Sequence, residues 1–393
     1  MISEKNCYKI MLIMPMSTLN FGSESTGGVD SVCQLLLKGF LEINDPRFTY
    51  NILMFDPSNR VEINGMVIKL NENISVTLFN VNNGSFLPNI ITIYRNIKDQ
   101  ISILKPDLVH SHLMAWGVNF SIKSKSVITI HGYKKIARKS RSFLNNIIYE
   151  DLIPFLANKM DNNYTCVSNN LKNVIKNEFN KDLEVIYNPI IEDYFSTNSE
   201  RMSTVSTGTL KLTTCGLLTQ RKGIHHIIKV MEILKNKGVK ASLTIIGPIT
   251  DHVYFNKLKK MIKEAKFTDD ILFKGKLETK DIKKLYLNSD IGIFLSEEET
   301  FGLVPIEMLS TGLPTIASKT GVIEDFFSSK QTIKNLSIVN YDDYDGIAQI
   351  ACGHAKFGKR PTSEDCVDVK DLFSKKVICE SYNDYYIRII KDD

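Results

Sequence analysis

Residues 296–314 read Ser-Glu-Glu-Glu-Thr-Phe-Gly-Leu-Val-Pro-Ile-Glu-Met-Leu-Ser-Thr-Gly-Leu-Pro. The short apolar run of residues 291–295 before them predicts a buried strand, and residues 315–317 after them predict another. Pro305 suits the first helical position, because its missing N–H has no partner to lose there. Gly312 suits the left-handed stop of that helix, and the proline that ends the stretch prevents its continuation. The stretch therefore predicts a loop and a short helix between two strands of an α/β sheet.

Two carboxylates of this stretch, Glu299 and Glu307, lie eight positions apart across the start of the expected helix. In an open α/β sheet such a loop lies at the carboxyl edge of the strands, where ligands bind. A helix N-terminus there offers N–H groups and a positive dipole end to a phosphate. Two acids suit neutral hydroxyls, so we expect a sugar ring at Glu299 and a ribose at Glu307. An acidic surface run before an ordinary helix is the alternative interpretation.

These residues resemble the E-x7-E signature of the GT4-like, or group 1, retaining glycosyltransferases. Glu299, Phe301, Gly302, Leu303 and Glu307 all match it. The resemblance implies an α/β, GT-B fold with two doubly wound Rossmann-like domains facing across a cleft. It also implies a C-terminal helix that crosses back to the first domain. The implied reaction is a retaining, metal-independent sugar transfer from a nucleotide-sugar, with no cofactor.

Composition is that of an ordinary globular protein of two domains. The chain has 393 residues, 43% of them hydrophobic and 24% charged. A net charge of +5 is too mild to indicate a nucleic-acid partner. The seven cysteines are odd in number and scattered, which predicts free thiols and a reducing compartment. Residues 10–14 predict a first strand rather than a signal sequence, and no apolar run is long enough to span a membrane. We therefore expect a cytoplasmic protein.

Strand-like and helix-like patterns alternate along the whole chain, which predicts parallel sheets covered on both faces. A polar linker within residues 193–211 suggests an N-terminal acceptor-side domain at 1–195 and a nucleotide-sugar-binding domain at 196–372, with a returning helix at 373–393. Helical spacing is clear at 32–40, 224–235, 255–265 and 373–390. Strands are expected at 9–14, 50–55, 108–112, 127–131, 164–168, 185–187, 211–215, 242–246, 271–273, 290–295, 315–317 and 336–339.

Gly27 and Gly28 follow the first strand region and precede an amphipathic helix. Paired glycines let a backbone approach a ligand closely, and the helix start suits a diphosphate. A plain loop is the commoner explanation of two glycines, although the resembled family carries a similar loop here. The dinucleotide fingerprint G-x-G-x-x-G is absent, which argues against a nicotinamide or flavin enzyme.

Residues 215–223 resemble the family segment G-R-L-x-x-x-K-G, in which an arginine and a lysine bind the donor diphosphate. Lys222 and Gly223 match, whereas Leu217 occupies the position of the arginine. Arg221 is the candidate for the second cation, because a departing diphosphate gains charge. A solvent-exposed basic helix start is the alternative. Lys274 and Gly275 lie where the family contacts the base of the nucleotide.

His131 ends a predicted strand and resembles the histidine that the family places near the donor sugar and acceptor. A neutral imidazole there can bind a hydroxyl or relay a proton; capping of the strand end is the alternative. His110 and His112 alternate on a strand, as a metal pair can, but no third ligand follows, so we expect them to be structural. Asp343-Tyr344-Asp345 spells D-x-D, and helix capping explains it better than a metal.

A basic cluster follows His131: Lys134, Lys135, Arg138, Lys139 and Arg141. A solvated helix face and a peripheral contact with an anionic membrane explain it equally well. The sequence thus favours a glycosyltransferase acting on a UDP- or GDP-sugar and a glycan or lipid-linked acceptor. O-antigen, lipopolysaccharide or capsule synthesis is the expected setting. A nucleotide-sugar epimerase on the same fold and a catalytically silent partner subunit, the latter suggested by Leu217, are the alternatives.

Overall fold

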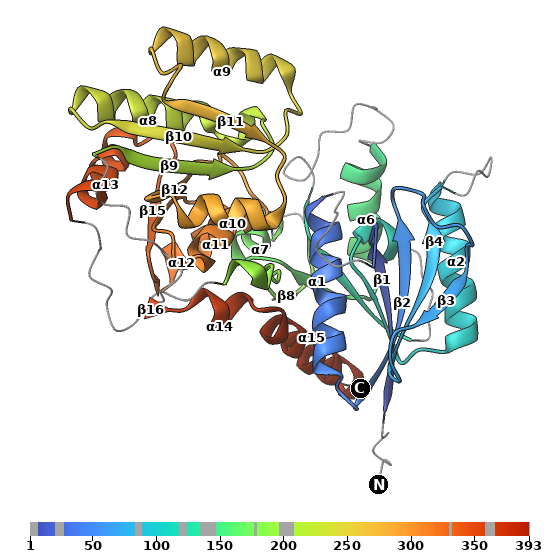
Figure 1. Cartoon of the computed structure of the whole chain (residues 1–393). Coiled ribbons are helices and arrows are strands. Elements are labelled where there is room, and N and C mark those ends of the chain that lie inside the picture. The colour runs from blue at the N-terminus through green and yellow to red at the C-terminus, as the bar shows by residue number, and fades with distance from the viewer. Residues whose placement is uncertain are drawn as a thin grey trace. The chain divides into compact units, whose positions relative to one another are not determined.

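The computed structural model describes residues 7–19, 27–82, 89–117, 124–133, 147–176, 179–195, 208–329, 332–357 and 366–392. The chain divides into two compact units (Figure 1). One combines Met1–Pro189 with Lys375–Asp393, and the other is Ile190–Ser374. Residues 190–195 thus belong to the second unit, where the rings of Tyr194 and Tyr286 lie 5.9 Å apart.

The first unit is built on an eight-stranded sheet in the order β3-β4-β2-β1-β5-β6-β7-β8. Its strands are β1 (Tyr8–Pro15), β2 (Phe48–Asp56), β3 (Met66–Lys69), β4 (Ile74–Asn80), β5 (Leu108–Ser111), β6 (Lys125–Ile130), β7 (Asn163–Cys166) and β8 (Leu183–Val185). Only β3 and β4 pair antiparallel among these strands. Its helices are α1 (Gly28–Ile43), α2 (Asn89–Leu104), α3 (Met114–Gly117), α6 (Ile153–Lys159), α7 (Asn169–Ile175) and α15 (Lys375–Lys391), with a π-helical turn η1 at Ile147–Leu152.

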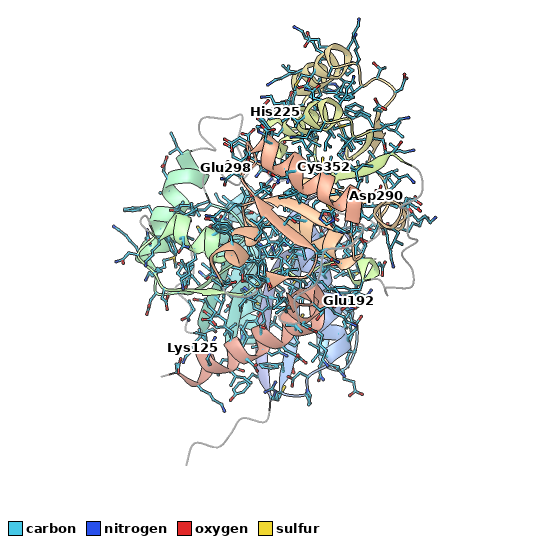
Figure 2. All side chains as sticks on the ribbon, turned by 90° about the vertical axis from the view of Figure 1, so that its left-hand side faces the viewer. Lys125, Glu192, His225, Asp290, Glu298 and Cys352 are labelled. Atoms are coloured by element: carbon cyan, nitrogen blue, oxygen red, sulfur yellow. The ribbon has the colours of Figure 1, made fainter. Side chains whose placement is uncertain are left out.

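The last helix, α15, packs against α1 of the first unit, as expected from the sequence (Figure 1). Tyr382 and Tyr386 of α15 are buried in the same core as the apolar residues of β1 and β2. Gly39 permits the close packing, because a Cβ at this position would lie 2.5 Å from the Cys379 Sγ. At the end of the helix, Lys125 Nζ donates to the carbonyl of Ile390 at 3.3 Å. Figure 2 labels Lys125 on the ribbon.

The second unit contains a six-stranded parallel sheet in the order β11-β10-β9-β12-β13-β15. Its strands are β9 (Leu210–Cys215), β10 (Ala241–Ile246), β11 (Ile271–Gly275), β12 (Ile291–Phe294), β13 (Thr315–Ser318) and β15 (Leu336–Val339), and β14 (Thr332–Ile333) pairs with β16 (Cys366–Val367). Its helices are α8 (Ile224–Asn236), α9 (His252–Glu264), α10 (Thr279–Leu287), α11 (Leu303–Ser310), α12 (Val322–Ser328), α13 (Tyr344–Phe357) and α14 (Val369–Phe373), with 3-10 turns η2 (Glu192–Tyr194) and η3 (Gln220–Lys222).

Every strand expected from the sequence has a counterpart in these two sheets. Strands β3 and β4 were not expected. Three of the four β3 residues are exposed, so this antiparallel edge strand has no buried apolar run to reveal it. In β4, Ser75 and Thr77 interrupt the apolar residues, so no continuous apolar run marks this strand.

Candidate active site

Two neighbouring strands of the second sheet, β9 and β12, carry the loops that form the candidate site. The strand order reverses between them, because β10 and β11 lie on one side and β13 and β15 on the other. Ligands bind at the carboxyl ends of strands at such a reversal. The loop after β9 ends in Lys222, and the loop after β12 contains Glu299. The topology therefore brings together two residues that are 77 positions apart.

Gly223 permits the close approach of these two loops. Its φ is +65°, and a Cβ on it would lie only 1.8 Å from the carbonyl oxygen of Leu295. No other residue fits this place without moving the backbone. The loops are also joined by a hydrogen bond to the carbonyl of Arg221, which accepts from the Glu297 N–H at 2.9 Å.

Lys222 and Glu299 form a buried ion pair, with 2.6 Å between Nζ and Oε1 and side chains 15% and 8% exposed. The Ser296 hydroxyl donates to the same carboxylate oxygen at 2.7 Å. The Lys222 ammonium also lies 5.3 Å from the ring centroid of Phe294, at the end of β12. One cation and one hydroxyl therefore hold the Glu299 carboxylate in place.

Glu307, on α11, differs from Glu299 in having no hydrogen bond or ion pair within the described residues. Its side chain is half-buried. Desolvation raises its pKa to about 7, against the opposing effect of the positive charge of Lys222. The pKa of the Cys215 thiol is raised to about 12, mainly by burial of the thiol and in addition by the negative charge of Glu307. A partly desolvated carboxylate beside a lysine suits a ligand that brings its own hydroxyl donors.

The other predicted site residues of the second unit lie around these loops. Gly302, with φ +85°, precedes α11, and Leu303 is its first residue. The sequence suggested Pro305 as the first helical residue, but it is the third. The N–H that proline lacks would still belong to the first turn, where backbone N–H groups have no intrahelical partner. The Phe301 side chain is 3% exposed and packs against Phe373, and its carbonyl accepts from the Val322 N–H at 2.8 Å, so Phe301 supports the loop from within.

Of the remaining site residues predicted in the second unit, some support the loops and others are exposed to solvent. Arg221 donates from Nη1 to the carbonyl of Glu298 at 3.1 Å, so its guanidinium holds the loop that leads to Glu299. Leu217, at the family's arginine position, is 47% exposed. Lys274 is exposed at the end of β11, and the carbonyl of Gly275 accepts from the Gly247 N–H at 2.8 Å.

Gly27 and Gly28 lie at the start of α1 in the first unit, as predicted. A Cβ at either glycine would meet no atom of the described residues within 4 Å. Packing of the described chain therefore does not require glycine at these positions. The space beside them is wide enough for a ligand to approach the backbone closely. Asp30, in the first turn, accepts from the Ser17 hydroxyl at 2.6 Å and fixes this helix start against the chain that follows β1.

His131 follows β6 and is the half-buried end of a chain of three histidines in the first unit, of which His110 and His112 are buried. Its Nε2 is 3.2 Å from His112 Nδ1. Burial lowers the pKa of His131 to about 4, although a hydrogen bond to the Asn188 side chain opposes this. His110 has both ring nitrogens occupied, by the Tyr386 hydroxyl at 2.6 Å and the Thr129 hydroxyl at 2.7 Å. His110 is therefore structural, as expected, and His131 is a neutral imidazole.

Two further predictions concern metals and membranes. Asp343 accepts from the Gly346 N–H at 3.1 Å, which confirms that the D-x-D sequence caps α13. The basic cluster at residues 134–141 lies outside the described residues. No helix in the described part of the chain is long and apolar enough to cross a membrane.

The sequence prediction missed a group formed by His225, His226 and Glu297. The two adjacent histidines at a helix start were the only local sign of this group in the sequence.

Sequence models of two protein families match the two halves of the chain. The model described as glycosyl transferases group 1 matches residues 197–349, and the model described as glycosyltransferase family 4 matches residues 50–194. The chain belongs to the group 1 glycosyltransferases. The family expected from residues 299–307 is thereby confirmed.

Relatives of this group 1 glycosyltransferase are distant in sequence. N-acetyl-alpha-D-glucosaminyl L-malate synthase of Bacillus anthracis is 25% identical over 282 residues, which cover 68% of this chain and 69% of that protein. An O-antigen chain mannosyltransferase of Salmonella typhimurium is 24% identical over 205 residues, 51% of this chain and 54% of the other. These identities show kinship within the family and leave the substrate of this glycosyltransferase open.

Solved structures share the fold of this glycosyltransferase over almost its whole length. Sucrose-phosphate synthase from Thermosynechococcus elongatus has a TM-score of 0.72 at 14% identity, covering 98% of this chain and 100% of that one. Anabaena HepE, solved in complex with UDP-glucose, has a TM-score of 0.66 at 15% identity, covering 97% and 100%. The GT-B fold expected from the sequence is confirmed.

Proposed function

We propose that this protein is a retaining hexosyltransferase that moves a hexose-type sugar from a UDP- or GDP-sugar to a glycan or lipid-linked acceptor. The arrangement of Lys222, Glu299 and Glu307 carries the proposal. It offers one cation for a diphosphate and two carboxylates for sugar hydroxyls. The likeness to a structure that holds UDP-glucose supports a uridine donor.

Each donor group has a counterpart in the second unit. Glu307 accepts hydrogen bonds from the ribose hydroxyls, and Glu299 accepts them from the donor sugar. The N–H groups of Gly302 and Leu303, at the start of α11, face the diphosphate together with Lys222, and the segment Lys274–Gly275 faces the base. Without donor, the positive charge of Lys222 is balanced by the carboxylate of Glu299. The diphosphate gains negative charge as the sugar departs, so its attraction for Lys222 is greatest in the transition state.

The first unit supplies uncharged groups to the same reaction. The backbone at Gly27 and Gly28 approaches the diphosphate, and the neutral imidazole of His131 binds a hydroxyl of the donor sugar or the acceptor. The sugar C1–O bond to the diphosphate breaks, and the acceptor oxygen bonds to C1 from the same face. The acceptor proton passes to the leaving diphosphate oxygen. This route needs neither a metal nor an enzyme nucleophile.

The setting that we propose is synthesis of bacterial surface polysaccharide, O-antigen, lipopolysaccharide or capsule, at the inner face of the cytoplasmic membrane. The O-antigen mannosyltransferase among the relatives supports this setting. The basic residues at 134–141 supply the charge for a peripheral contact with anionic lipid.

The test is nucleotide release from a panel of UDP-, GDP- and ADP-sugars, with and without EDTA. We expect slow hydrolysis of one donor that persists in EDTA and is lost in Lys222→Ala and Glu307→Ala. The matched control is Lys263→Ala, which removes an exposed lysine of α9. A trapped covalent glycosyl-enzyme would contradict the proposed same-face route.

A catalytically silent partner subunit is the second candidate, and the exposed Leu217 at the family's arginine position is the observation that favours it. No release of any donor, even with a lipid acceptor extract, would support it. The substitution Leu217→Arg separates the two functions. A large gain in turnover indicates a degenerate site, whereas a loss indicates that Arg221 already supplies the second cation.

A further inference from the structure

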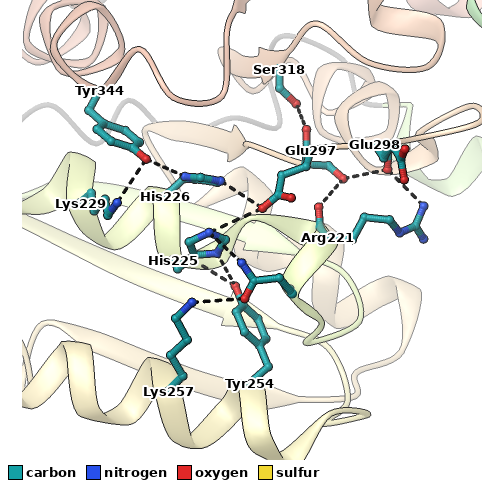
Figure 3. Close-up of polar contacts among 12 residues, drawn as sticks. Arg221, His225, His226, Lys229, Tyr254, Lys257, Glu297, Glu298, Ser318 and Tyr344 are labelled. Carbon is teal, nitrogen blue, oxygen red and sulfur yellow. Dashed lines mark hydrogen bonds and ion pairs between the residues drawn. The ribbon is translucent and has the colours of Figure 1, made fainter. Parts of the chain in front are cut away.

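Two adjacent histidines of the second unit converge on one carboxylate (Figure 3). His225 and His226 belong to the first turn of α8, and Glu297 lies in the loop after β12. The Glu297 Oε1 is 3.2 Å from His226 Nε2 and 3.6 Å from His225 Nε2. Their ligand atoms all lie within 4.8 Å of one another, and no other such group of three histidine, cysteine or acidic residues occurs in the described chain.

A tyrosine hydroxyl holds the far side of each imidazole. His225 Nδ1 lies 3.0 Å from the Tyr254 hydroxyl, and His226 Nδ1 lies 2.9 Å from the Tyr344 hydroxyl. Both Nε2 atoms are thereby directed to the same point near Glu297 (Figure 3). Metal-binding histidines are oriented in this way, by a second hydrogen bond from the ring nitrogen that does not bind the metal.

The contacts of Gln220 show which nitrogen of His225 carries the lone pair. Lys257 Nζ can only donate, so the Gln220 oxygen 3.4 Å away accepts from it. The Gln220 amide nitrogen must then donate to His225 Nε2 at 3.2 Å. His225 Nδ1 therefore carries the proton and donates to Tyr254. The lone pair is on Nε2, where it accepts from Gln220 in this structure and where a metal ion would take the place of that amide.

We propose that His225, His226 and Glu297 bind a Zn²⁺ ion. Bonds of about 2.0–2.1 Å in a tetrahedral shell place neighbouring ligand atoms roughly 3.3 Å apart, close to the two nitrogen–oxygen distances seen here. Two imidazoles and one carboxylate leave a fourth position for water. The histidine side chains are 9% and 8% exposed and that of Glu297 is 34% exposed, so the ion enters from the carboxylate side. Burial lowers the pKa of both histidines.

The ion joins the two loops of the candidate active site without contacting the donor. His225 follows η3, which contains Lys222, and Glu297 is two residues before Glu299. A Zn²⁺ ion here adds to the backbone hydrogen bond from Glu297 to Arg221 and fixes one loop against the other. It is a positioning site, independent of the sugar transfer proposed above.

The test is direct metal binding. Protein is stripped with a chelator, dialysed against Zn²⁺ or Mg²⁺, and analysed for bound metal. We expect one Zn²⁺ per chain and no Mg²⁺, because nitrogen ligands do not suit Mg²⁺. In the Co²⁺-loaded protein we expect the visible spectrum of a tetrahedral ion. Glu297→Gln abolishes binding, whereas the neighbouring substitution Glu298→Gln leaves it unchanged, and so does His252→Gln on the exposed start of α9.

Two further measurements separate a built site from surface adsorption. Tyr344→Phe removes only an orienting hydroxyl, so Zn²⁺ affinity should fall about 10- to 100-fold. Zn²⁺ should raise the Tm of the wild type and of Glu298→Gln but not of Glu297→Gln, with all three folded when metal-free. Equal Zn²⁺ binding by Glu297→Gln, or none by the wild type, overturns the proposal. Donor hydrolysis that survives EDTA is expected in either case, so the two proposals fail separately.

Discussion

His131 in the first unit and Glu307 in the second are both shifted toward their neutral forms by desolvation. For His131 the result is a pKa of about 4, with only a hydrogen bond to Asn188 opposing the shift. For Glu307 the result is a pKa of about 7, with the charge of Lys222 opposing it. Near neutral pH the histidine is fixed in one form, whereas the glutamate is divided between two.

The difference comes from the neighbours of each group. The first unit surrounds its histidines with hydroxyls and other imidazoles, which bind neutral rings without charging them. The second unit places a lysine beside two carboxylates. The first arrangement suits uncharged hydroxyl groups, and the second suits the charged diphosphate of a nucleotide-sugar. Charge changes in the second unit should therefore have the larger effects.

Removing the cation should have the largest effect. In Lys222→Ala we expect donor hydrolysis to fall by roughly 10²–10³-fold, the usual loss when one stabilising group of a transition state is removed. Steady-state kinetics measures it, with Lys263→Ala as the control. If turnover fell less than tenfold, Lys222 would not be the main partner of the diphosphate.

Donor affinity should depend on pH through Glu307. Only the ionised carboxylate accepts hydrogen bonds from both ribose hydroxyls, so affinity should rise with pH through about 7. Below that value it should fall roughly tenfold per pH unit. Calorimetric titration of the nucleoside diphosphate from pH 5.5 to 8 measures this dependence. Glu307→Gln, which cannot ionise, should flatten it; the same slope in the variant would assign it to the ligand.

The same glutamate should reduce stability at high pH. Its folded pKa of about 7 exceeds its ordinary value of 4.5, so its stability contribution is full below 4.5 and is lost as pH rises through 7. At pH 8 we expect Glu307→Gln to be more stable than the wild type by on the order of 2 kcal/mol, allowing for solvent around the half-buried side chain. Urea unfolding at pH 5 and pH 8 tests this, and equal differences at both would refute the assignment.

His131 should matter less and should not titrate. Because its pKa is about 4, the imidazole is already neutral from pH 5.5 upward. We expect His131→Gln to slow turnover about tenfold, the loss of one hydrogen bond, without changing the shape of the pH–rate profile. A lost acidic limb near pH 6 in the variant would show that the histidine titrates during the reaction.

The smallest effect should come from the structural end of the histidine chain. Tyr386→Phe removes the hydroxyl that lies 2.6 Å from His110 Nδ1. We expect a loss of about 1–2 kcal/mol in the free energy of unfolding and no change in donor hydrolysis. Tyr385→Phe, in the same helix, serves as the control. A kinetic effect of Tyr386→Phe would mean that His110 positions the reacting groups through His112 and His131.

The sequence was most informative where local pattern and tertiary structure coincide. The buried strand β12 and the left-handed Gly312 both appear where the stretch at 296–314 placed them, because a parallel strand is apolar on both faces and only glycine stops a helix cheaply in that conformation. The start of this helix was predicted at Pro305, two residues later than its observed start at Leu303. Proline does not fix the exact start, because any residue of the first turn can lack its N–H.

Features that depend on burial or on distant partners could not be predicted from the sequence. Phe301 matches a donor-binding signature, yet its side chain packs against Phe373, far away in the chain. The half-neutral state of Glu307 depends on the desolvation produced by its surroundings. The group of His225, His226 and Glu297 needs residues 71 positions apart to meet, and only the folded loops bring them together.

The placement of α15 in the first unit has a consequence for how the protein is made. Tyr382 and Tyr386 complete a core whose other members lie mostly in the first half of the chain. A ribosome synthesises all of Ile190–Ser374 before it reaches them. The second unit is contiguous and can fold while it emerges, whereas the core of the first unit cannot be completed until α15 has left the exit tunnel.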